Sequence, residues 1–306
     1  MKKFIKIFSR CFSRLTKTNK TASTSPPRPA TPTTNPTTVP TVVGNALDPR
    51  PHHLSQPQSS APTPLTPALI KAYETEYPLF SLNRLGVDHS HRDWFRRVNI
   101  AVRKHMNTLD ASHNYQHIRR VVSNAAYILE EEKKQHQWAR DIDPIILWVT
   151  CMTHDIGDTK YQADGEQLSQ HDQIVQFLSV LDCPSYIRRQ VAYLAPRVSF
   201  KKEMANEADT KAFADVYQVL RIVQDADRLD GLGAIGVSRL FIYGGVDEVR
   251  RNGSIDSGIK LIEARFGEYA RLMKTETGRK IAEERYGWMK EDFVRRWEAE
   301  ADTSNV

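Results

Sequence analysis

The chain of 306 residues has little cysteine and no long hydrophobic run. Its three cysteines form no regular framework and no Cys-x-x-Cys pair, which is typical of proteins in a reducing compartment. The longest apolar run falls far short of the roughly 20 residues that a membrane-spanning helix needs. These absences argue against a disulfide-stabilised secreted protein and against a transmembrane segment. The sequence therefore predicts a soluble, intracellular protein.

Acidic residues are scarce in one part of the chain. Residues 1–50 contain nine Lys or Arg and a single acid, Asp48, whereas the remaining residues carry almost equal numbers of acids and bases. The formal net charge of +6 therefore comes from the N-terminal region. Because the rest of the chain is nearly neutral, its charge gives no reason to expect a nucleic-acid partner.

The first 67 residues divide into two segments. In residues 1–19, apolar residues such as Phe4, Phe8 and Phe12 recur at helical spacing with Lys and Arg between them, which predicts a basic amphipathic segment. This segment resembles a mitochondrial presequence, but a membrane-surface helix or an inert tail would share the pattern, so a cytoplasmic or a mitochondrial location is expected. Residues 20–67 are rich in Pro, Ser and Thr, which predicts a disordered linker.

Residues 68–306 lack the alternating apolar pattern and the hairpin turns that are typical of β-strands. Their apolar residues recur at helical spacing, which predicts an all-α fold with a single helical bundle. One helix start is marked by Asp143-Pro144, because aspartate is a good N-cap and proline suits the first helical position. Helices are expected over residues 91–107, 114–136, 143–155, 165–181, 184–196, 207–228, 231–241, 255–275 and 278–300.

The dipeptide His154-Asp155 lies at the end of the apolar run 145–152. An imidazole and a carboxylate at the end of a buried helix are costly to desolvate unless they have a partner. A divalent cation is the simplest partner, because both groups are good ligands for such ions. Two adjacent residues do not complete a coordination sphere, so further ligands are expected on other helices.

Two residues meet this expectation. His117 precedes Val121 by four residues, so its ring points with the apolar stripe of the helix over 114–136. Asp227 follows Val223 by four residues near the end of the helix over 207–228. Taken singly, His117 has the simpler interpretation of a hydrogen-bonded core residue, and Asp227 could pair with Arg228.

The predicted ligands, His117, His154, Asp155 and Asp227, are two imidazoles and two carboxylates without a thiolate. This set favours one Mn, Co, Ni, Fe or Mg ion per chain over a closed structural zinc site. Supporting residues are expected behind the ligands, where they would orient them. The candidates for this role are His113, Asp225 and Asp230.

These residues resemble the HD-domain phosphohydrolase superfamily, whose signature is His…His-Asp…Asp. The chain is most similar to its YpgQ-like subgroup, small metal-dependent nucleotide pyrophosphohydrolases, and the resemblance covers about residues 90–300. One departure is Asn114, since the subgroup usually has aspartate there and asparagine does not ionise. The segments that carry the resemblance are residues 110–121, 153–158, 223–239, 241–245 and 273–285.

The resemblance implies a single HD-type bundle that hydrolyses nucleoside or deoxynucleoside triphosphates to a monophosphate and pyrophosphate. Asp158 matches the position of an acidic catalytic residue in several HD hydrolases, so we expect it to act as a general acid or base. Capping of a helix end or a salt bridge with Lys160 is the alternative. Di-iron HD oxygenases need two further histidines before the last aspartate. Only His171 is available there, which favours a single metal ion.

Contacts with the substrate are less well marked. Lys160, Lys201 and Lys202 are candidates for binding phosphate, and Arg239 for lining the nucleotide pocket. Other activities stay open: a nucleoside monophosphate phosphatase, a guanosine-tetraphosphate-type hydrolase, or a non-catalytic nucleotide-binding module with a structural metal. The sequence indicates no oligomeric state and leaves a homodimer open.

Overall fold

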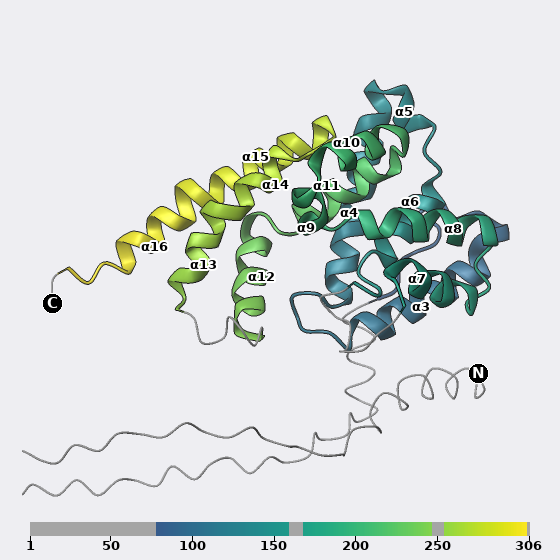
Figure 1. Cartoon of the computed structure of the whole chain (residues 1–306), viewed down its shortest axis with the longest axis horizontal. Helices are drawn as coiled ribbons and strands as arrows, with labels where there is room; N and C mark the ends of the chain where they lie inside the picture. Colours follow the sequence, from purple (N-terminus) through teal and green to yellow (C-terminus); the bar gives the residue numbers. More distant parts are fainter. Residues whose placement is uncertain (1–77, 159–167, 247–253, 305–306) are drawn as a thin grey trace, which may run out of the picture. The chain divides into compact units, whose positions relative to one another are not determined.

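Every regular element in the described part of the chain is a helix (Figure 1). The computed structural model describes residues 78–158, 168–246 and 254–304. The predicted all-α fold is therefore confirmed for these residues. The predicted segments 1–19 and 20–67 lie outside them, and so does Lys160. No helix among the described residues is both long enough and apolar enough to cross a membrane.

Three helices form the centre of the bundle: α4 (Tyr115–Gln135), α6 (Pro144–Thr153) and α11 (Val219–Leu229). Each of them packs against the other two. Helix α6 is buried at every position after its proline, because its residues are apolar or hydrogen-bonded on all sides. Helix α4 buries one stripe and leaves its other face polar, as its sequence pattern predicts. All four predicted metal ligands lie on or next to these helices.

The start of α4 and the start of α6 each depend on one side chain. Asn114 accepts a hydrogen bond from the backbone N–H of Gln116 (3.0 Å), and Asp143 accepts one from Ile145 (2.8 Å). Each side chain satisfies one of the N–H groups that a helix leaves unpaired at its first turn. The asparagine that departs from the family pattern is thus the N-cap of the helix that carries His117.

The end of α6 differs from the prediction, because the helix stops at Thr153 and not at residue 155. His154 to Gly157 form a turn, and Gly157 has a left-handed backbone with φ of 66°. A side chain at Gly157 would also meet the side chain of Gln173 at 2.8 Å. Glycine therefore lets the chain leave the helix directly after the ligands.

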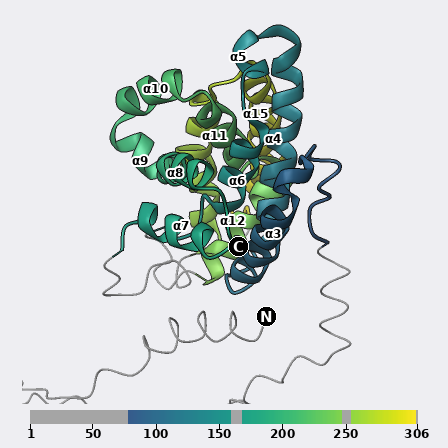
Figure 2. The ribbon, with the colours of Figure 1, turned by 90° about the vertical axis from the view of Figure 1, so that its right-hand side faces the viewer.

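The remaining helices of the first half surround this centre. Helices α7 and α8 pack against each other, and α8 also packs against α6 (Figure 2). Two short helices, α5 and α9, were not predicted. The bounds are η1 (His89–His91), α3 (Arg92–Met106), α5 (Gln137–Arg140), α7 (Gln170–Ser179), α8 (Ser185–Leu194), η3 (Ala195–Arg197), α9 (Phe200–Ala205) and α10 (Glu207–Val216).

The helix predicted over residues 207–228 is two helices, α10 and α11. The chain turns at Tyr217, whose φ of −105° and ψ of 75° are not helical. The guanidinium group of Arg221 then donates to the carbonyl oxygen of Ala214 (3.1 Å) and satisfies one of the carbonyls at the end of α10. The prediction of one continuous helix was wrong because a side chain replaces the backbone bond at this break.

The C-terminal part is also helical, as predicted. Two of its elements, η4 and η5, are wider π-type turns inside longer helical runs. Figure 1 shows α15 and α16 as parts of one rod, and α15 packs against α11, α4 and α14. The bounds are α12 (Gly233–Val246), α13 (Asp256–Leu261), η4 (Ile262–Phe266), α14 (Gly267–Arg271), α15 (Glu276–Trp288), η5 (Met289–Val294) and α16 (Arg295–Glu300).

Candidate metal centre

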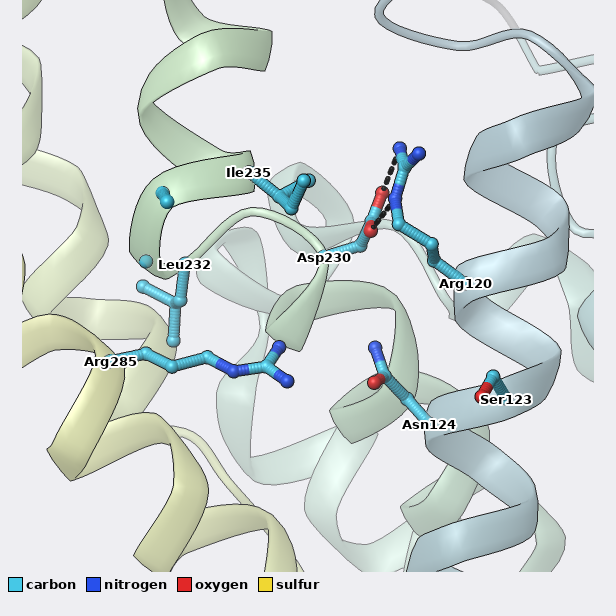
Figure 3. Close-up of a pocket in the computed structure, with 9 residues that line it drawn as sticks. Arg120, Ser123, Asn124, Asp230, Leu232, Ile235 and Arg285 are labelled. Carbon is cyan, nitrogen blue, oxygen red and sulfur yellow. Dashed lines mark hydrogen bonds and ion pairs between the residues drawn. The ribbon is translucent and has the colours of Figure 1, made fainter.

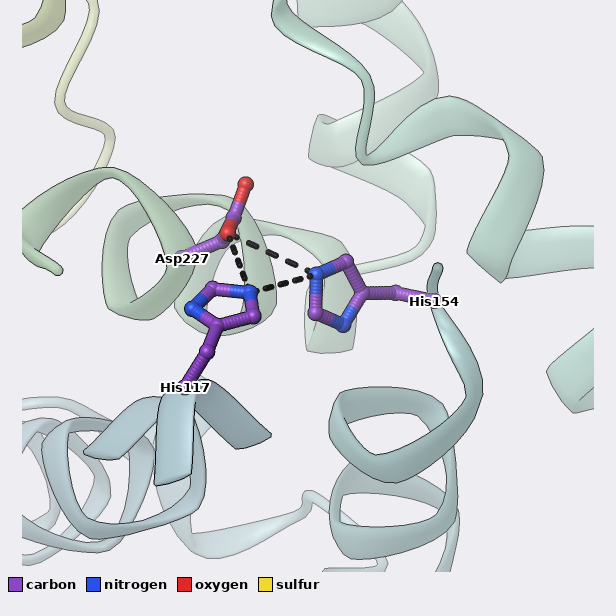
Figure 4. A group of neighbouring side chains, drawn as sticks. All are labelled: His117, His154 and Asp227. Carbon is purple, nitrogen blue, oxygen red and sulfur yellow. Dashed lines mark hydrogen bonds and ion pairs between the residues drawn. The ribbon is translucent and has the colours of Figure 1, made fainter. Parts of the chain in front are cut away.

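The structure brings the four predicted ligands together. His117 lies in the first turn of α4, His154 and Asp155 follow the end of α6, and Asp227 lies near the end of α11. His117 Nε2 lies 3.4 Å from His154 Nε2, 3.4 Å from Asp155 Oδ2 and 3.5 Å from Asp227 Oδ1. His154 Nε2 lies 3.5 Å from Asp155 Oδ2 and 3.4 Å from Asp227 Oδ1. Figure 4 shows the two rings and Asp227 facing one another.

These separations fit a divalent cation. Neighbouring ligand atoms about 2.0–2.2 Å from an ion lie roughly 2.8–3.1 Å apart in an octahedral arrangement and roughly 3.3–3.6 Å apart in a tetrahedral one. The five distances of 3.4 to 3.5 Å join the two imidazoles to each other and to the two carboxylates, and a contraction of a few tenths of an ångström would bring them to the octahedral value. The nearby Cys151 is fully buried, and burial raises the pKa of its thiol, so this group is not a thiolate ligand. The four predicted ligands themselves offer two nitrogen and two oxygen donors.

The electrostatics of the metal-free cluster centre on His154. Burial by itself would lower its pKa, but the adjacent carboxylates of Asp155 and Asp227 outweigh burial and raise the pKa to about 9. Burial would raise the pKa of Asp227, and the imidazoles of His154 and His117 instead hold it well below its usual range. A buried carboxylate kept ionised beside two imidazoles is suited to hold a cation.

Hydrogen bonds behind the rings turn both histidines toward the cluster. His117 Nδ1 donates to Asp230 Oδ2 (2.7 Å), and His154 Nδ1 donates to the carbonyl oxygen of Cys151 (2.9 Å). These bonds leave the Nε2 lone pair of each ring directed at the cluster, as a ligand requires. The structure thus places Asp230 where the sequence predicted it, behind a ligand.

Asp230 is itself held by two guanidinium groups. It is 2% exposed, and it accepts bonds from Arg120 Nη2 (3.0 Å) and Arg239 Nη1 (3.0 Å). Burial would raise its pKa, but His117 and Arg120 hold the pKa well below its usual range. Arg239 also donates to the carbonyl oxygen of Ser112 (2.7 Å), so in this structure it positions Asp230. Its predicted contact with the nucleotide stays a prediction.

Asp225 has a different place from the predicted one. Its carboxylate accepts hydrogen bonds from the backbone N–H groups of Lys274 (3.0 Å) and Thr275 (2.8 Å) and from the hydroxyl of Thr275 (2.7 Å). It therefore holds the segment that begins α15. Successive helix residues turn by about 100°, so Asp225 and Asp227 leave α11 in nearly opposite directions. The prediction that Asp225 stands behind a ligand was wrong for this reason.

His113 lies at the edge of the cluster. Its ring packs edge-on against His117, with centroids 5.9 Å apart, and against Tyr243 at 5.6 Å. Its Nδ1 lies 2.6 Å from Ser112 Oγ. A hydrogen bond with His113 is the main reason why the pKa of Asp110 lies well below its usual range. His113 thus supports His117 by ring packing, while its Nδ1 contacts Ser112 and Asp110 in the loop before α4.

Asp158 follows the turn that contains the ligands. Its backbone N–H donates to the carbonyl oxygen of Asp155 (3.3 Å), and its side chain is half-buried. Because α6 has already ended, Asp158 is not one helical turn beyond Asp155, as a continuous helix would place it. Its role in proton transfer stays a prediction.

The two predicted lysines of α9 differ in their surroundings. Both are exposed, but Lys202 Nζ also donates to Gln170 Oε1 (3.3 Å) and to the carbonyl oxygen of Pro196 (3.0 Å). Gln170 in turn donates to the carbonyl oxygen of His154 (2.7 Å). Sequence reasoning missed Gln170, because nothing local places its helix beside the cluster. It also missed Arg120, which could have been found three residues after His117 on the same helix.

Comparisons with known proteins identify the family of the chain. The family model described as HD domain matches residues 114–232, which include all four predicted ligands. The uncharacterized protein YpgQ of Bacillus subtilis is 30% identical over 191 residues, which cover 61% of this chain and 84% of YpgQ.

Solved structures show the same fold. The structure of Bacillus subtilis YpgQ in complex with ADP has a TM-score of 0.51 and 25% identity, and the match covers 66% of this chain and 97% of that one. A Lactobacillus plantarum protein has a TM-score of 0.52 at 20% identity, with 68% and 97% covered. Together with the family model and the YpgQ sequence, these matches show that the chain belongs to the HD-domain superfamily of metal-dependent phosphohydrolases.

Proposed function

We propose that this protein is a divalent-metal-dependent nucleotide pyrophosphohydrolase, which converts a nucleoside or deoxynucleoside triphosphate to a monophosphate and pyrophosphate. The observation that carries the proposal is the cluster of His117, His154, Asp155 and Asp227, in which the Nε2 atoms of the two histidines lie 3.4 to 3.5 Å from each other and from an oxygen of each carboxylate. A cation held by such a set lowers the pKa of water and neutralises phosphate oxygens.

The chain's own residues would supply the remaining steps. Asp230 and the carbonyl oxygen of Cys151 fix the ring orientation of the two histidines, so the cluster needs little rearrangement to bind. Asp158 would take the proton from the attacking water or give one to the leaving oxygen. Lys160, Lys201 and Lys202 would contact the phosphates. The bonds of Lys202 to Gln170, and of Gln170 to His154, support a place for this lysine near the cluster.

A nucleotide as the substrate is supported by the relatives. The solved YpgQ structure is a complex with ADP, whose phosphoanhydride is the kind of bond that the proposed reaction breaks. The cluster leaves coordination positions for water and substrate, because four protein ligands do not fill an octahedral sphere. A nucleotide polyphosphate is therefore the substrate class that we propose.

The test is an assay of the full chain with Mn²⁺ or Co²⁺ and a panel of nucleoside and deoxynucleoside triphosphates. We expect release of pyrophosphate, and loss of activity by at least a hundredfold in a His154→Ala, Asp155→Ala double variant. The chain offers a matched control, because the exposed neighbours His171 and Asp172 repeat the same dipeptide outside the cluster. A His171→Ala, Asp172→Ala double variant should keep its activity.

The products separate the alternatives. Equal rates in the wild type and the His154→Ala, Asp155→Ala variant would refute the proposal. With nucleoside monophosphates and guanosine tetraphosphate added to the panel, phosphate released from a monophosphate without turnover of triphosphates would identify a monophosphate phosphatase, and pyrophosphate released from the 3′ position of the tetraphosphate would identify a tetraphosphate-type hydrolase. Tight nucleotide binding without turnover with any metal would identify a binding module.

A further inference from the structure

A cavity lies between α4, α12 and α15, and Asp230, which orients the predicted ligand His117, is part of its lining. It has a volume of about 330 Å³, and Figure 3 shows Arg285 reaching into it from one side and Asn124 from the other. The four predicted metal ligands are not among its lining residues. Its volume is at the lower end of the range of about 300–1,000 Å³ for small-molecule sites. The cavity therefore suits a small ligand.

The lining of the cavity carries excess positive charge. Arg285 Nη1 donates to the carbonyl oxygen of Leu229 (2.7 Å), and no carboxylate of the described residues forms an ion pair with Arg285. The carboxylate that lines the cavity, Asp230, is already shared by Arg120 and Arg239. Arg285 thus lines the cavity without an ion-pair partner of its own among the described residues, and an additional negative charge would be attracted to it.

The first turn of α12 adds hydrogen-bond donors to the same cavity. Ala234 and Ile235 line it, and both are exposed, so a ligand can enter from solvent. The N–H groups at the start of a helix have no partner within the helix, and they carry the positive end of its dipole. The hydroxyl of Ser123 lines the opposite wall on α4.

We propose that this cavity is a second binding site, which takes a small phosphate-bearing anion on Arg285, Arg120 and the first turn of α12. Guanidinium groups bind phosphate oxygens through paired, charge-assisted hydrogen bonds. The volume admits inorganic phosphate or the phosphate group of a nucleoside monophosphate. The site contains none of the four predicted metal ligands, although it shares Asp230 and Arg120 with the groups that orient His117, so its occupancy does not rest on the proposed activity.

The experiment is a calorimetric titration of the full chain in EDTA with inorganic phosphate and, in parallel, with AMP. An Arg285→Gln variant should bind the preferred anion about ten- to a hundredfold more weakly, because it loses a charge-assisted contact. The matched control is Lys280→Gln, which removes one positive charge from an exposed position on the same helix and should bind as the wild type does. The tighter probe identifies the source of the phosphate group.

A second variant guards against misfolding of Arg285→Gln. Ile235 is 44% exposed, so Ile235→Glu places a negative charge at the cavity without disturbing the core, and it should weaken binding at least tenfold. Its control is Ile242→Glu, an exposed position on the same helix. Equal affinities in the wild type, Arg285→Gln and Ile235→Glu would overturn the proposal, and so would the absence of any binding in the millimolar range.

Discussion

Replacing Asp230 by asparagine should damage both stability and metal binding. The substitution keeps the shape of the side chain and removes its charge, while His117, Arg120 and Arg239 still present N–H donors to it. An amide offers one oxygen to these donors, and its NH₂ group faces at least one of them. Two guanidinium groups are then left without their counter-charge.

The expected loss follows from burial. Removing one partner of a buried ion pair costs about 3–5 kcal/mol. Asp230 is 2% exposed, but the side chains of Arg120 (30%) and Arg239 (15%) keep some contact with water. We therefore expect the lower end of the range, about 3 kcal/mol in the free energy of unfolding. The affinity for Mn²⁺ should fall about 10- to 100-fold, because His117 loses the bond that orients it.

The assay combines urea unfolding of the full chain in EDTA with calorimetric titration of Mn²⁺. Asp209→Asn is the control, since Asp209 is an exposed acid on α10 that should change neither quantity measurably. Unchanged unfolding together with wild-type Mn²⁺ affinity in Asp230→Asn would refute the argument that this carboxylate orients His117.

Three further predictions concern the surroundings of the cluster. Gly157→Ala should lower the free energy of unfolding, measured in urea, by about 1–2 kcal/mol, because φ is 66° and the new side chain meets Gln173. An unchanged free energy of unfolding would contradict the argument that alanine is strained at this position. The pKa of His154 is raised to about 9 from about 6.5 in the unfolded chain, so in EDTA its stabilisation is complete below pH 6.5 and is lost as the pH rises through 9. Urea unfolding across this window should show the loss, and His154→Ala should abolish it. Asp225→Ala should cost about 2–3 kcal/mol, measured in the same way, because three donors at the start of α15 lose their acceptor; an unchanged value would show that this cap is dispensable.

The sequence was sufficient to predict the parts that depend on local pattern. The apolar stripe of α4 pointed His117 inward, and the buried run of α6 ended at His154-Asp155, so the cluster could be assembled from helix faces alone. What a helix faces across the bundle could not be predicted. Asp225 and Asp227 have the same chemistry and lie two residues apart, and only the position of α15 decides which one supports the neighbouring helix. The break at Tyr217 was missed for a different reason, because the side-chain cap by Arg221 leaves no signal in the spacing of apolar residues.

One short segment of helix α11 contributes to two separate parts of the structure. Asp225 secures the start of α15, and Asp227, two residues further along on the opposite face, completes the cluster with α4 and α6. During synthesis, the ligands from α4, α6 and α11 leave the ribosome well before residues 274 and 275. We therefore expect a nascent chain to gain its affinity for the cation late, when the C-terminal helix docks. We expect chains that end before α15 to bind less of the cation than the full chain does.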